Sequence, residues 1–587
     1  MMEVYRCESP DCEFVTQRED LAVCPLCGGM SFVPADPEEI TPKGWLCLCR
    51  EAARAGNQRQ AYGFCCRGAE GDDPACLCEK GRRLHRGSGT LRSFRQAADC
   101  FERAAARGSD DGRCLLGLCF EKGEGRPQSW ENAVFLYKQA AENGFAPAQC
   151  NLGWCYEFGK GLPMDKKAAA YWYGMAALQK EPRAQCCLAV CYLNGIGVTP
   201  DQSRAVQLYG LSAAAGYPPA QCALGELYEE GRGVPKDPAR AVRLYRRAAE
   251  TGLDRAQYAL GRCYEKGIGV EKSAADAACW YGAAARRGHA AAQVAFGLCC
   301  EFGDGVEQNK PAAVEWYRRA AHQGEADGEC NLGFCYQQGI GVVSNDAEAV
   351  RWYAAAAEHG HRRALYCLAQ CYEEGRALPR DPAQAAALYL RAAEKGSEAA
   401  MNRLGFLYET GTGVPRDVER AVDWYRRAAE RGYAPAQCNL GWCYESGSGV
   451  AKDPARAVIW YRAAAEQDSP RGQCNLGVCY ENGIGLEPDA AEATRWYRRA
   501  AEQGYGRAQW YLGMNYEAGK GVPRDIAEAA RWYEKAAGQG VIEARYAWGR
   551  CCERLGQREQ ARRLYREAAA RGSEKARQAL ERLEDNG

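Results

Sequence analysis

A 36-residue repeat limits what this 587-residue chain can fold into. The twelve residues APAQCNLGWCYE occur at 146–157 and again at 434–445, which is a separation of eight 36-residue steps. Steps of 36 residues meet glycine or alanine fourteen times, without an insertion or a deletion, at Gly81, Gly117, Gly153, Ala189, Gly225, Gly261, Gly297, Gly333, Ala369, Gly405, Gly441, Gly477, Gly513 and Gly549. A strict period of this length is typical of a protein built from stacked, similar units.

Each unit is predicted to form two helices. The first carries the pattern LGxCYExG around a residue such as Gly441, with apolar residues at helical spacing. It ends in a G-x-G turn such as Gly231 and Gly233, where glycine can adopt the left-handed conformation. We expect Asp237 to cap the second helix and Pro238 to begin it, because proline at that position loses no hydrogen bond.

Small residues at fixed places let helices approach closely, and a single helix pair cannot bury both of its faces. The chain is therefore predicted to be all-α, a right-handed α-solenoid of about fourteen helix-turn-helix units. We divide it into a small β-type segment with four cysteines (1–34), a linker with a degenerate leading helical segment (35–74), the repeat solenoid (75–572) and a C-terminal capping helix (573–587).

The repeated pattern LGxxYExGxGVxxDxxxAxxWYxxAAExG resembles the Sel-1-like repeat family, which is related to tetratricopeptide repeats. The resemblance covers nearly everything from about Ala75 onward. It implies an adaptor or scaffold that holds other proteins or peptides, rather than an enzyme.

The amino-terminal segment contains four cysteines with the spacing C-x4-C-x11-C-x2-C, namely Cys7, Cys12, Cys24 and Cys27. Two cysteine knuckles of this kind favour a tetrahedral four-thiolate zinc site, and the segment resembles a zinc ribbon or a rubredoxin-like knuckle. Iron is the lesser alternative, because four thiolates do not by themselves separate iron from zinc. A zinc ion held by four cysteines has no open coordination position, so we expect it to be structural.

Five further cysteines lie between this segment and the regular repeats, at Cys47, Cys49, Cys65, Cys66 and Cys76. They are compatible with a second metal site, but a degenerate leading repeat is favoured, because Cys78 lies 36 residues before Cys114. Within the repeats, Cys150 and Cys155 point about 140° apart on one helix and cannot share a metal. We interpret them as small core residues on two buried faces.

A glutamate recurs four residues after the glycine. We expect it to accept hydrogen bonds from the backbone or a basic side chain of a neighbouring repeat, because a carboxylate near the end of a helix needs a partner. The positions are Glu121, Glu157, Glu229, Glu265, Glu301, Glu373, Glu409, Glu445, Glu481, Glu517 and Glu553.

Two other positions are candidates for binding a partner on the concave face. The residue directly after the glycine changes its chemistry from repeat to repeat, and its aromatic members are possible anchors: Trp154, Phe334, Phe406 and Trp442. Partial burial against the next helix is the alternative. An asparagine recurs at Asn151, Asn331, Asn439 and Asn475. It forms either an inter-repeat hydrogen bond or a ladder that binds an extended peptide backbone.

Charge argues against one class of partner. The chain has 76 lysines and arginines and 76 aspartates and glutamates, so no net charge attracts nucleic acid. Acidic residues also outnumber basic ones around the four-cysteine segment, where a phosphate backbone would be disfavoured. A nucleic-acid-associated factor acting through that segment is kept as the alternative function.

The expected function is a non-enzymatic protein-interaction scaffold, monomeric and cytoplasmic. There is no signal-peptide pattern and no apolar run of about 18 residues, so we expect no membrane insertion, while leaderless export as an effector is left open. None of the five histidines lies in a catalytic pattern, and we predict no catalytic or cofactor-binding residue beyond the zinc cysteines. A weaker alternative is a hydrolase, as proposed for some cysteine-rich relatives of this repeat family.

Overall fold

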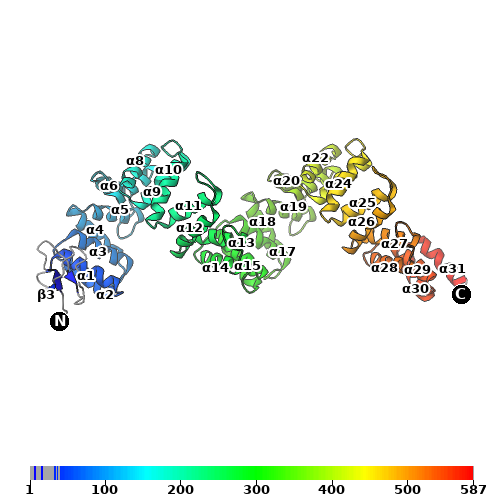
Figure 1. The fold of residues 1–587 in the computed structure, drawn as a ribbon, viewed down its shortest axis with the longest axis horizontal. Helices are drawn as coiled ribbons and strands as arrows, with labels where there is room; N and C mark the ends of the chain where they lie inside the picture. The colour runs from blue at the N-terminus through cyan, green and yellow to red at the C-terminus, as the bar shows by residue number, and fades with distance from the viewer. Residues whose placement is uncertain (1–4, 8–14, 17–31, 35, 37–39, 586–587) are drawn as a thin grey trace. The chain divides into compact units, whose positions relative to one another are not determined.

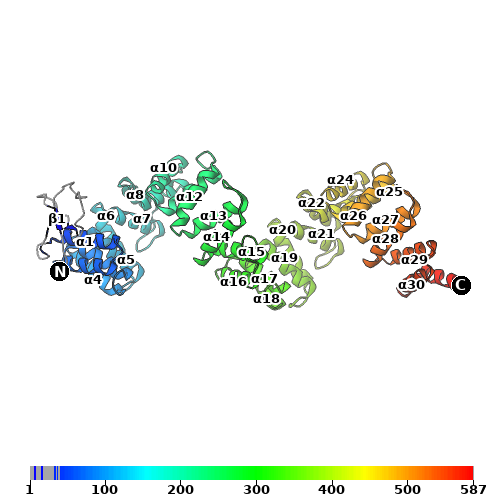
Figure 2. The same ribbon diagram turned by 60° about the horizontal axis from the view of Figure 1, so that its bottom comes forward.

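Helices account for nearly all of the chain that the structure describes. The structure is a computed structural model, which describes residues 5–7, 15–16, 32–34, 36 and 40–585. It divides into two compact units, Met1–His289 and Ala290–Gly587. In both views of the ribbon, consecutive helices lie side by side within each unit (Figures 1 and 2). The chain is an all-α solenoid over the repeats, as the 36-residue period predicts.

The first unit contains fourteen helices among its described residues. They are α1 (Pro42–Arg54), α2 (Gln58–Gly68), α3 (Pro74–Arg86), α4 (Phe94–Ala106), α5 (Asp110–Lys122), α6 (Trp130–Glu142), α7 (Ala146–Phe158), α8 (Lys166–Leu178), α9 (Pro182–Asn194), α10 (Gln202–Ala214), α11 (Pro218–Glu230), α12 (Pro238–Glu250), α13 (Asp254–Lys266) and α14 (Ala274–Arg286).

The second unit continues the same pattern to the carboxyl end of the described chain. Its helices are α15 (Ala290–Phe302), α16 (Lys310–Ala321), α17 (Ala326–Gln338), α18 (Asp346–Glu358), α19 (Arg362–Glu374), α20 (Pro382–Glu394), α21 (Glu398–Thr410), α22 (Val418–Glu430), α23 (Ala434–Ser446), α24 (Pro454–Glu466), α25 (Pro470–Asn482), α26 (Ala490–Glu502), α27 (Gly506–Ala518), α28 (Ile526–Gly538), α29 (Ile542–Arg554), α30 (Arg558–Ala570) and α31 (Glu574–Asp585). We call the odd-numbered helices α3 to α29 first helices and the even-numbered helices α4 to α30 second helices.

Three short strands precede the helices. β1 (Tyr5–Cys7) pairs antiparallel with β2 (Val15–Thr16) and with β3 (Phe32–Pro34), in the order β2-β1-β3. Of the predicted zinc ligands, Cys7 is the last residue of β1, while Cys12, Cys24 and Cys27 lie outside the described residues. The four-cysteine zinc ribbon therefore stays a prediction.

Local sequence signals set the helix boundaries. Asp237 is the N-cap of α12, where its carboxylate Oδ1 accepts a hydrogen bond from the backbone N–H of Arg240 at 2.8 Å. Pro238 is the first residue of that helix, and Gly231 ends α11 with a φ of +77°. These are the roles predicted for the three residues, and they confirm the helix-turn-helix unit. Capping of this kind satisfies backbone donors that the helix itself cannot.

The glycine that marks the repeat lies against a tyrosine ring of the following second helix. A Cβ atom added at Gly441 would lie 2.6 Å from Cε1 of Tyr461, and Tyr461 is fully buried. The space between the two helices is filled by the ring, so a larger residue at position 441 has no room. Two repeats have a buried alanine in place of this glycine, Ala189 and Ala369, so a methyl group can be accommodated there.

Helices also pack at both ends of the repeat array. Leading helices α1 and α2 pack around Trp45, Leu48 and Phe64, in the segment predicted to be a degenerate repeat. At the other end, α31 packs on α30 after the last repeat. None of the helices that the structure describes is long and apolar enough to cross a membrane.

Candidate functional site

The variable position after the glycine reaches solvent in several repeats. The next residue on a helix points about 100° away, so it leaves the buried face that the glycine occupies. Phe406 on α21 is 40% exposed and Trp442 on α23 is 43% exposed. Large exposed aromatic side chains on neighbouring first helices are available for contact with a partner. Leu298 and Met514, at the same repeat position, are also exposed.

The other two predicted anchors are half-buried by neighbours. The ring of Trp154 on α7 stacks on that of Trp130 at a centroid distance of 5.8 Å and lies 5.1 Å from that of Phe158. Phe334 on α17 is covered by the guanidinium of Arg363, which lies 4.8 Å from its ring centroid. These residues therefore combine the two alternatives, since each packs against neighbours and each keeps part of its ring in solvent.

Two arginines hold the aromatic rings of the second unit in place. Arg403 lies over Phe406 at 4.7 Å, as Arg363 does over Phe334. Such cation–π contacts restrict the rotamers of both side chains and place a positive charge beside each ring. Arg403 also forms an ion pair with Glu373, so the guanidinium beside Phe406 already has a carboxylate partner.

The four asparagines differ in their surroundings. Asn151 is buried, its side chain donates to Cys114 Sγ at 3.4 Å, and its Oδ1 accepts from Arg183 of the next first helix. The bond with Arg183 joins two repeats, which is one of the two roles predicted for this asparagine. The side chain of Asn331 accepts from Arg363 at 3.5 Å, and that of Asn439 donates to Asn402 at 2.9 Å. Within the described residues, the side chain of Asn475 forms no hydrogen bond.

The recurring glutamate pairs with the buried tyrosine of its own repeat, a partner that was not predicted for it. Tyr461 Oη donates to Glu445 Oε2 at 2.7 Å, and the same bond forms in most other repeats. The equivalent pairs are Tyr137–Glu121, Tyr173–Glu157, Tyr245–Glu229, Tyr281–Glu265, Tyr317–Glu301, Tyr389–Glu373, Tyr425–Glu409, Tyr497–Glu481 and Tyr533–Glu517. The constant 16-residue separation of the two residue types is the sequence signal for this pair.

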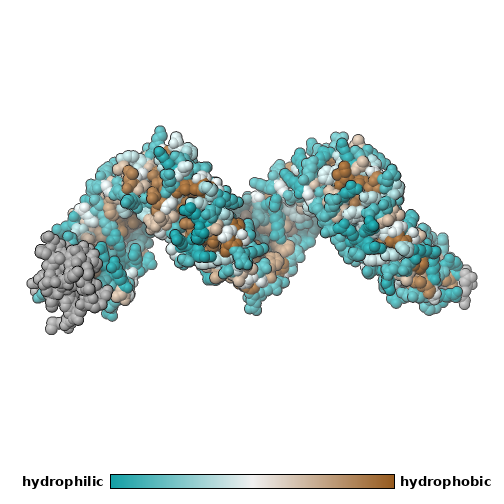
Figure 3. Space-filling view, in the orientation of Figure 1, coloured by the Kyte–Doolittle hydropathy of each residue, from teal (hydrophilic) through white to brown (hydrophobic). Residues whose placement is uncertain are grey.

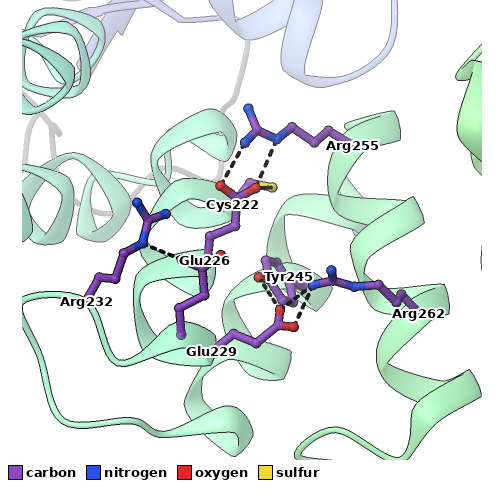
Figure 4. A network of polar contacts seen from close by, with 8 residues as sticks. Cys222, Glu226, Glu229, Arg232, Tyr245, Arg255 and Arg262 are labelled. Carbon is purple, nitrogen blue, oxygen red and sulfur yellow. Dashed lines mark hydrogen bonds and ion pairs between the residues drawn. The ribbon is translucent and has the colours of Figure 1, made fainter. Parts of the chain in front are cut away.

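The expected basic partner from a neighbouring repeat joins the pair in some repeats. Around Glu229, Tyr245 Oη donates at 2.8 Å and Arg262 Nη2 donates to both carboxylate oxygens at 2.6 and 2.7 Å (Figure 4). Burial, with Glu229 beside it, raises the pKa of the Tyr245 phenol. A carboxylate that accepts three hydrogen bonds from fixed neighbours is a structural element.

A glutamine also links consecutive repeats. Gln149 Nε2 of α7 donates to the Ala141 carbonyl at the end of α6 at 3.1 Å. The equivalent bonds are Gln221 to Ala213, Gln257 to Ala249, Gln437 to Ala429, Gln473 to Ala465 and Gln509 to Ala501. The glutamine adds a second hydrogen bond to a carbonyl at the end of the second helix, which in Ala141 also accepts from the Gly144 backbone N–H at 3.0 Å. Its 36-residue recurrence identifies it in the sequence.

The cysteines of the repeated twelve-residue segment are buried on two faces of one helix, as predicted. Cys150 and Cys155 are both buried in α7, yet their chemistry differs. A hydrogen bond from Cys187 lowers the pKa of Cys150, and Arg183 Nε donates to Cys150 Sγ at 3.1 Å. Burial raises the pKa of Cys155 to about 12.

The five cysteines of the leading segment form no metal site in the described part of the chain. No group of three or more histidine, cysteine, aspartate or glutamate side chains among the described residues is placed to hold a metal ion. Cys65 Sγ donates to the Tyr62 carbonyl at 3.1 Å, and Cys76 Sγ donates to the Pro42 carbonyl at 3.2 Å. These thiols thus take part in packing and backbone hydrogen bonds.

Two of the histidines serve local structure. His361 caps α19 by accepting at Nδ1 from the backbone N–H of Ala364, and its Nε2 lies 2.9 Å from Asp327 Oδ1. His85 Nε2 lies 2.8 Å from Glu124 Oε2. In both cases the ring is paired with a carboxylate of another helix or turn.

Comparisons with known proteins agree with the repeat geometry. The family model for the Sel1 repeat matches fourteen segments, at 77–109, 111–145, 146–181, 182–217, 218–253, 254–289, 290–325, 326–361, 362–397, 398–433, 434–469, 470–505, 506–541 and 543–573. A search of curated proteins found no match.

Two solved structures are similar to this chain. One is a protective antigen of uropathogenic Escherichia coli strains that displays an SLR fold, with 30% identity, coverage of 84% of this chain and 97% of that chain, and a TM-score of 0.48. The other is a Sel1 repeat protein from Oxalobacter formigenes, with 32% identity, coverage of 53% and 90%, and a TM-score of 0.42. The family matches span most of the chain, and the protein therefore belongs to the Sel1 repeat family.

Proposed function

We propose that this protein is a non-enzymatic scaffold that binds protein or peptide partners on its first helices. We call the partner-facing residues the first-helix surface and define it by Trp154, Phe334, Phe406 and Trp442, with Asn331, Asn439 and Asn475 beside them; Asn151, also predicted for this surface, is buried and bonded between repeats. The observation that carries the proposal is the exposure of Phe406 and Trp442 at one repeat position. Solenoids of this kind present extended surfaces for binding.

The chemistry of this surface suits an extended peptide. Tryptophan, tyrosine and arginine are enriched among the residues that dominate binding energy at interfaces. Phe406 on α21 and Trp442 on α23 lie on consecutive first helices, so one extended peptide can place an apolar side chain against each of them.

A binding experiment tests this surface. We expect the double variant Phe406→Ala/Trp442→Ala to lose partners that the wild-type chain captures from its native lysate. The control is Ile459→Ala, which removes an apolar side chain that is 61% exposed on the second helix α24. If both variants retain every partner to the same extent as the wild-type protein, the proposal that partners bind the first-helix surface is wrong.

A structural zinc ion in the amino-terminal segment completes the proposal. Cys7, Cys12, Cys24 and Cys27 would hold Zn²⁺ as four thiolates, and the segment would act as a second contact or an end module. The antiparallel pairing of β1 with β2 and β3 supports a compact β-type segment around Cys7.

We place the protein in the cytoplasm and expect a monomer. Thiols stay reduced in the cytoplasm, which is consistent with the free cysteines among the described residues. Buried cysteines then serve as small apolar residues.

A further inference from the structure

Two neighbouring second helices, α8 and α10, are less charged at their exposed positions than second helices such as α22. In α22 the residues 423–430 read DWYRRAAE, with charged side chains at the solvent-exposed positions. At the same repeat positions in α8, residues 171–178 read YWYGMAAL. Gly174, Met175 and Leu178 therefore replace two arginines and a glutamate. In the next second helix, α10, Gly210 and Leu211 again stand where α22 has its two arginines.

These replacements open an apolar hollow on the first unit. It has a volume of about 900 Å³ and lies across α8, α9 and α10, lined by Tyr171, Met175, Leu178, Leu188, Tyr192 and Leu211 among others. Figure 3 shows apolar surface over the part of this unit that Figure 1 labels α8 and α10. We call this hollow the second-helix groove.

Packing does not explain the two glycines. A Cβ atom added at Gly174 or at Gly210 would meet nothing within 4 Å. Glycine inside a helix is less favourable than alanine, because it loses more backbone freedom on folding. At Gly441 a tyrosine ring excludes a side chain, whereas at Gly174 the absent side chain leaves the helix backbone open to approach from outside.

The charge of the groove has one sign. Among its lining residues the charged ones are Lys167 and Lys180, with no aspartate or glutamate. Neither lysine forms an ion pair with another described residue. Lys167 is in the first turn of α8 and Lys180 lies in the turn that follows its end, so the two lysines lie near opposite ends of this helix.

The groove is open rather than enclosed. Tyr171 is 58% exposed, Leu178 is 80% exposed and Leu211 is 58% exposed, so its rim lies in solvent. Small-molecule sites usually bury most of their ligand, which this rim cannot do. An amphipathic helix needs only one face covered, and its other face can stay in water.

We propose that the second-helix groove binds an acidic amphipathic helix of a partner protein. The apolar face of that helix would lie over Tyr171, Leu178 and Leu211, with its backbone close to Gly174. Carboxylates near its two ends would pair with Lys167 and Lys180. This site is on second helices and does not depend on the first-helix surface.

Selection from a displayed library tests the proposal. The probe is a library of 18-residue peptides, randomised among apolar, acidic, basic and neutral polar residues, selected against the full chain. We expect the enriched peptides to carry apolar residues at i, i+3 or i+4, and i+7, with acidic residues near both ends. Enrichment of basic peptides, or of peptides without helical periodicity, would contradict the proposal.

Variants of the chain locate the binding. Gly174→Arg/Leu178→Glu introduces the residue types that α22 has at these positions, so the fold has a precedent for them. We expect the enriched peptides to bind this variant at least about tenfold more weakly, because the apolar contacts are lost. Ile459→Arg is the matched control, since it also makes an exposed apolar position charged, and should leave affinity unchanged.

Charge reversal tests the pairing with lysine. We expect Lys167→Glu to weaken binding roughly two- to fivefold, as for an exposed ion pair. Lys166 is not in the lining, so Lys166→Glu should have no such effect.

Equal binding of the enriched peptides to Gly174→Arg/Leu178→Glu and to the wild-type chain would overturn the proposal. Binding of dodecanoate to the chain without binding of any peptide would also overturn it, because that result would identify a fatty-acid site. Phe406→Ala/Trp442→Ala should bind the peptides normally, which separates this test from that of the first-helix surface.

Discussion

At the scale of single residues, Glu329 stands out in the row of glutamines that joins the repeats. It occupies the position of Gln149 and Gln437 but is a carboxylate, buried with its Oε2 lacking a hydrogen bond in the described structure. Its Oε1 lies 3.8 Å from Nε2 of His359. By analogy with the glutamines, the facing carbonyl is that of Ala321, to which an ionised carboxylate cannot donate.

We expect Glu329→Gln to stabilise the protein at pH 7 by about 1 kcal/mol, the usual net value of one hydrogen bond. Burial raises the pKa of Glu329, so its protonated form is favoured by the fold. The contribution of the protonated Glu329 carboxyl to the free energy of unfolding is complete at low pH, and it is lost as the pH rises through the pKa of the folded state.

Urea unfolding of both proteins at pH 4.5 and pH 7.5 measures this difference. The variant should gain little at the lower pH and more at the higher pH. A gain that is the same at both pH values would show that the carboxylate charge is not the cause.

Cys66 is the second residue with a specific prediction. Contact with the Cys65 thiol, followed by Tyr62 and Lys80, lowers the pKa of Cys66 to about 6. Burial raises the pKa of Cys155 to about 12. The thiolate is the reactive form, so Cys66 should react with iodoacetamide at pH 7 while Cys155 stays unmodified.

Mass spectrometry of labelled peptides follows the rate at Cys66. Between pH 7 and pH 8.5 it should change little, because the thiolate is already formed. Free cysteine, with a pKa near 8.5, should accelerate more than about tenfold over the same range. A parallel rise at Cys66 would show that its thiol is not activated.

At the scale of secondary-structure elements, the contact between glycine and tyrosine sets how closely the two helices of a repeat approach. Gly441→Val adds a branched side chain where a tyrosine ring already lies 2.6 Å from the added Cβ position. Overpacking of this kind typically costs about 1–3 kcal/mol. We therefore expect a lower unfolding midpoint in urea for this variant.

A matched control separates packing from helix propensity. Gly210→Val makes the same change inside α10, where an added Cβ meets nothing within 4 Å. Valine is a better helix former than glycine, so this variant should be unchanged or slightly more stable. Equal destabilisation by both substitutions would remove the packing explanation.

At the scale of the whole molecule, helices contact mainly their neighbours in sequence. In such an array, stability is close to a sum of repeat and nearest-neighbour terms, so the ends act independently of distant repeats. Loss of a metal at the amino terminus should therefore leave the helices of the later repeats folded.

We expect one zinc ion per chain by elemental analysis, and its loss in Cys24→Ser/Cys27→Ser. Far-UV circular dichroism should be almost unchanged, because the described helices begin at Pro42. The control Cys279→Ser alters an exposed cysteine of the repeats and should retain the zinc. A chain that contains iron, or no metal at all, would contradict the zinc assignment.

Periodicity and capping residues were sufficient to predict the repeat fold. Gly231, Asp237 and Pro238 act through backbone geometry and local hydrogen bonds, which depend on residues close in sequence. The tyrosine partner of Glu229 was missed, although it recurs with equal regularity, because the two residues lie on different helices. The second-helix groove was also not predicted, because it forms where small and apolar side chains of three helices lie together in space.

The two copies of APAQCNLGWCYE separate what the sequence determines from what the tertiary structure decides. The sequence by itself determines that both copies form a first helix with buried cysteines, because helical periodicity and burial are repeated with the segment. Only the tertiary structure decides their chemistry. Cys150 meets Cys187 of the following repeat and has a lowered pKa, whereas burial raises the pKa of Cys438, whose following repeat has Asn475 at that position. The reason is physical: a thiol pKa depends on the groups that surround it in space, and here these come from another repeat.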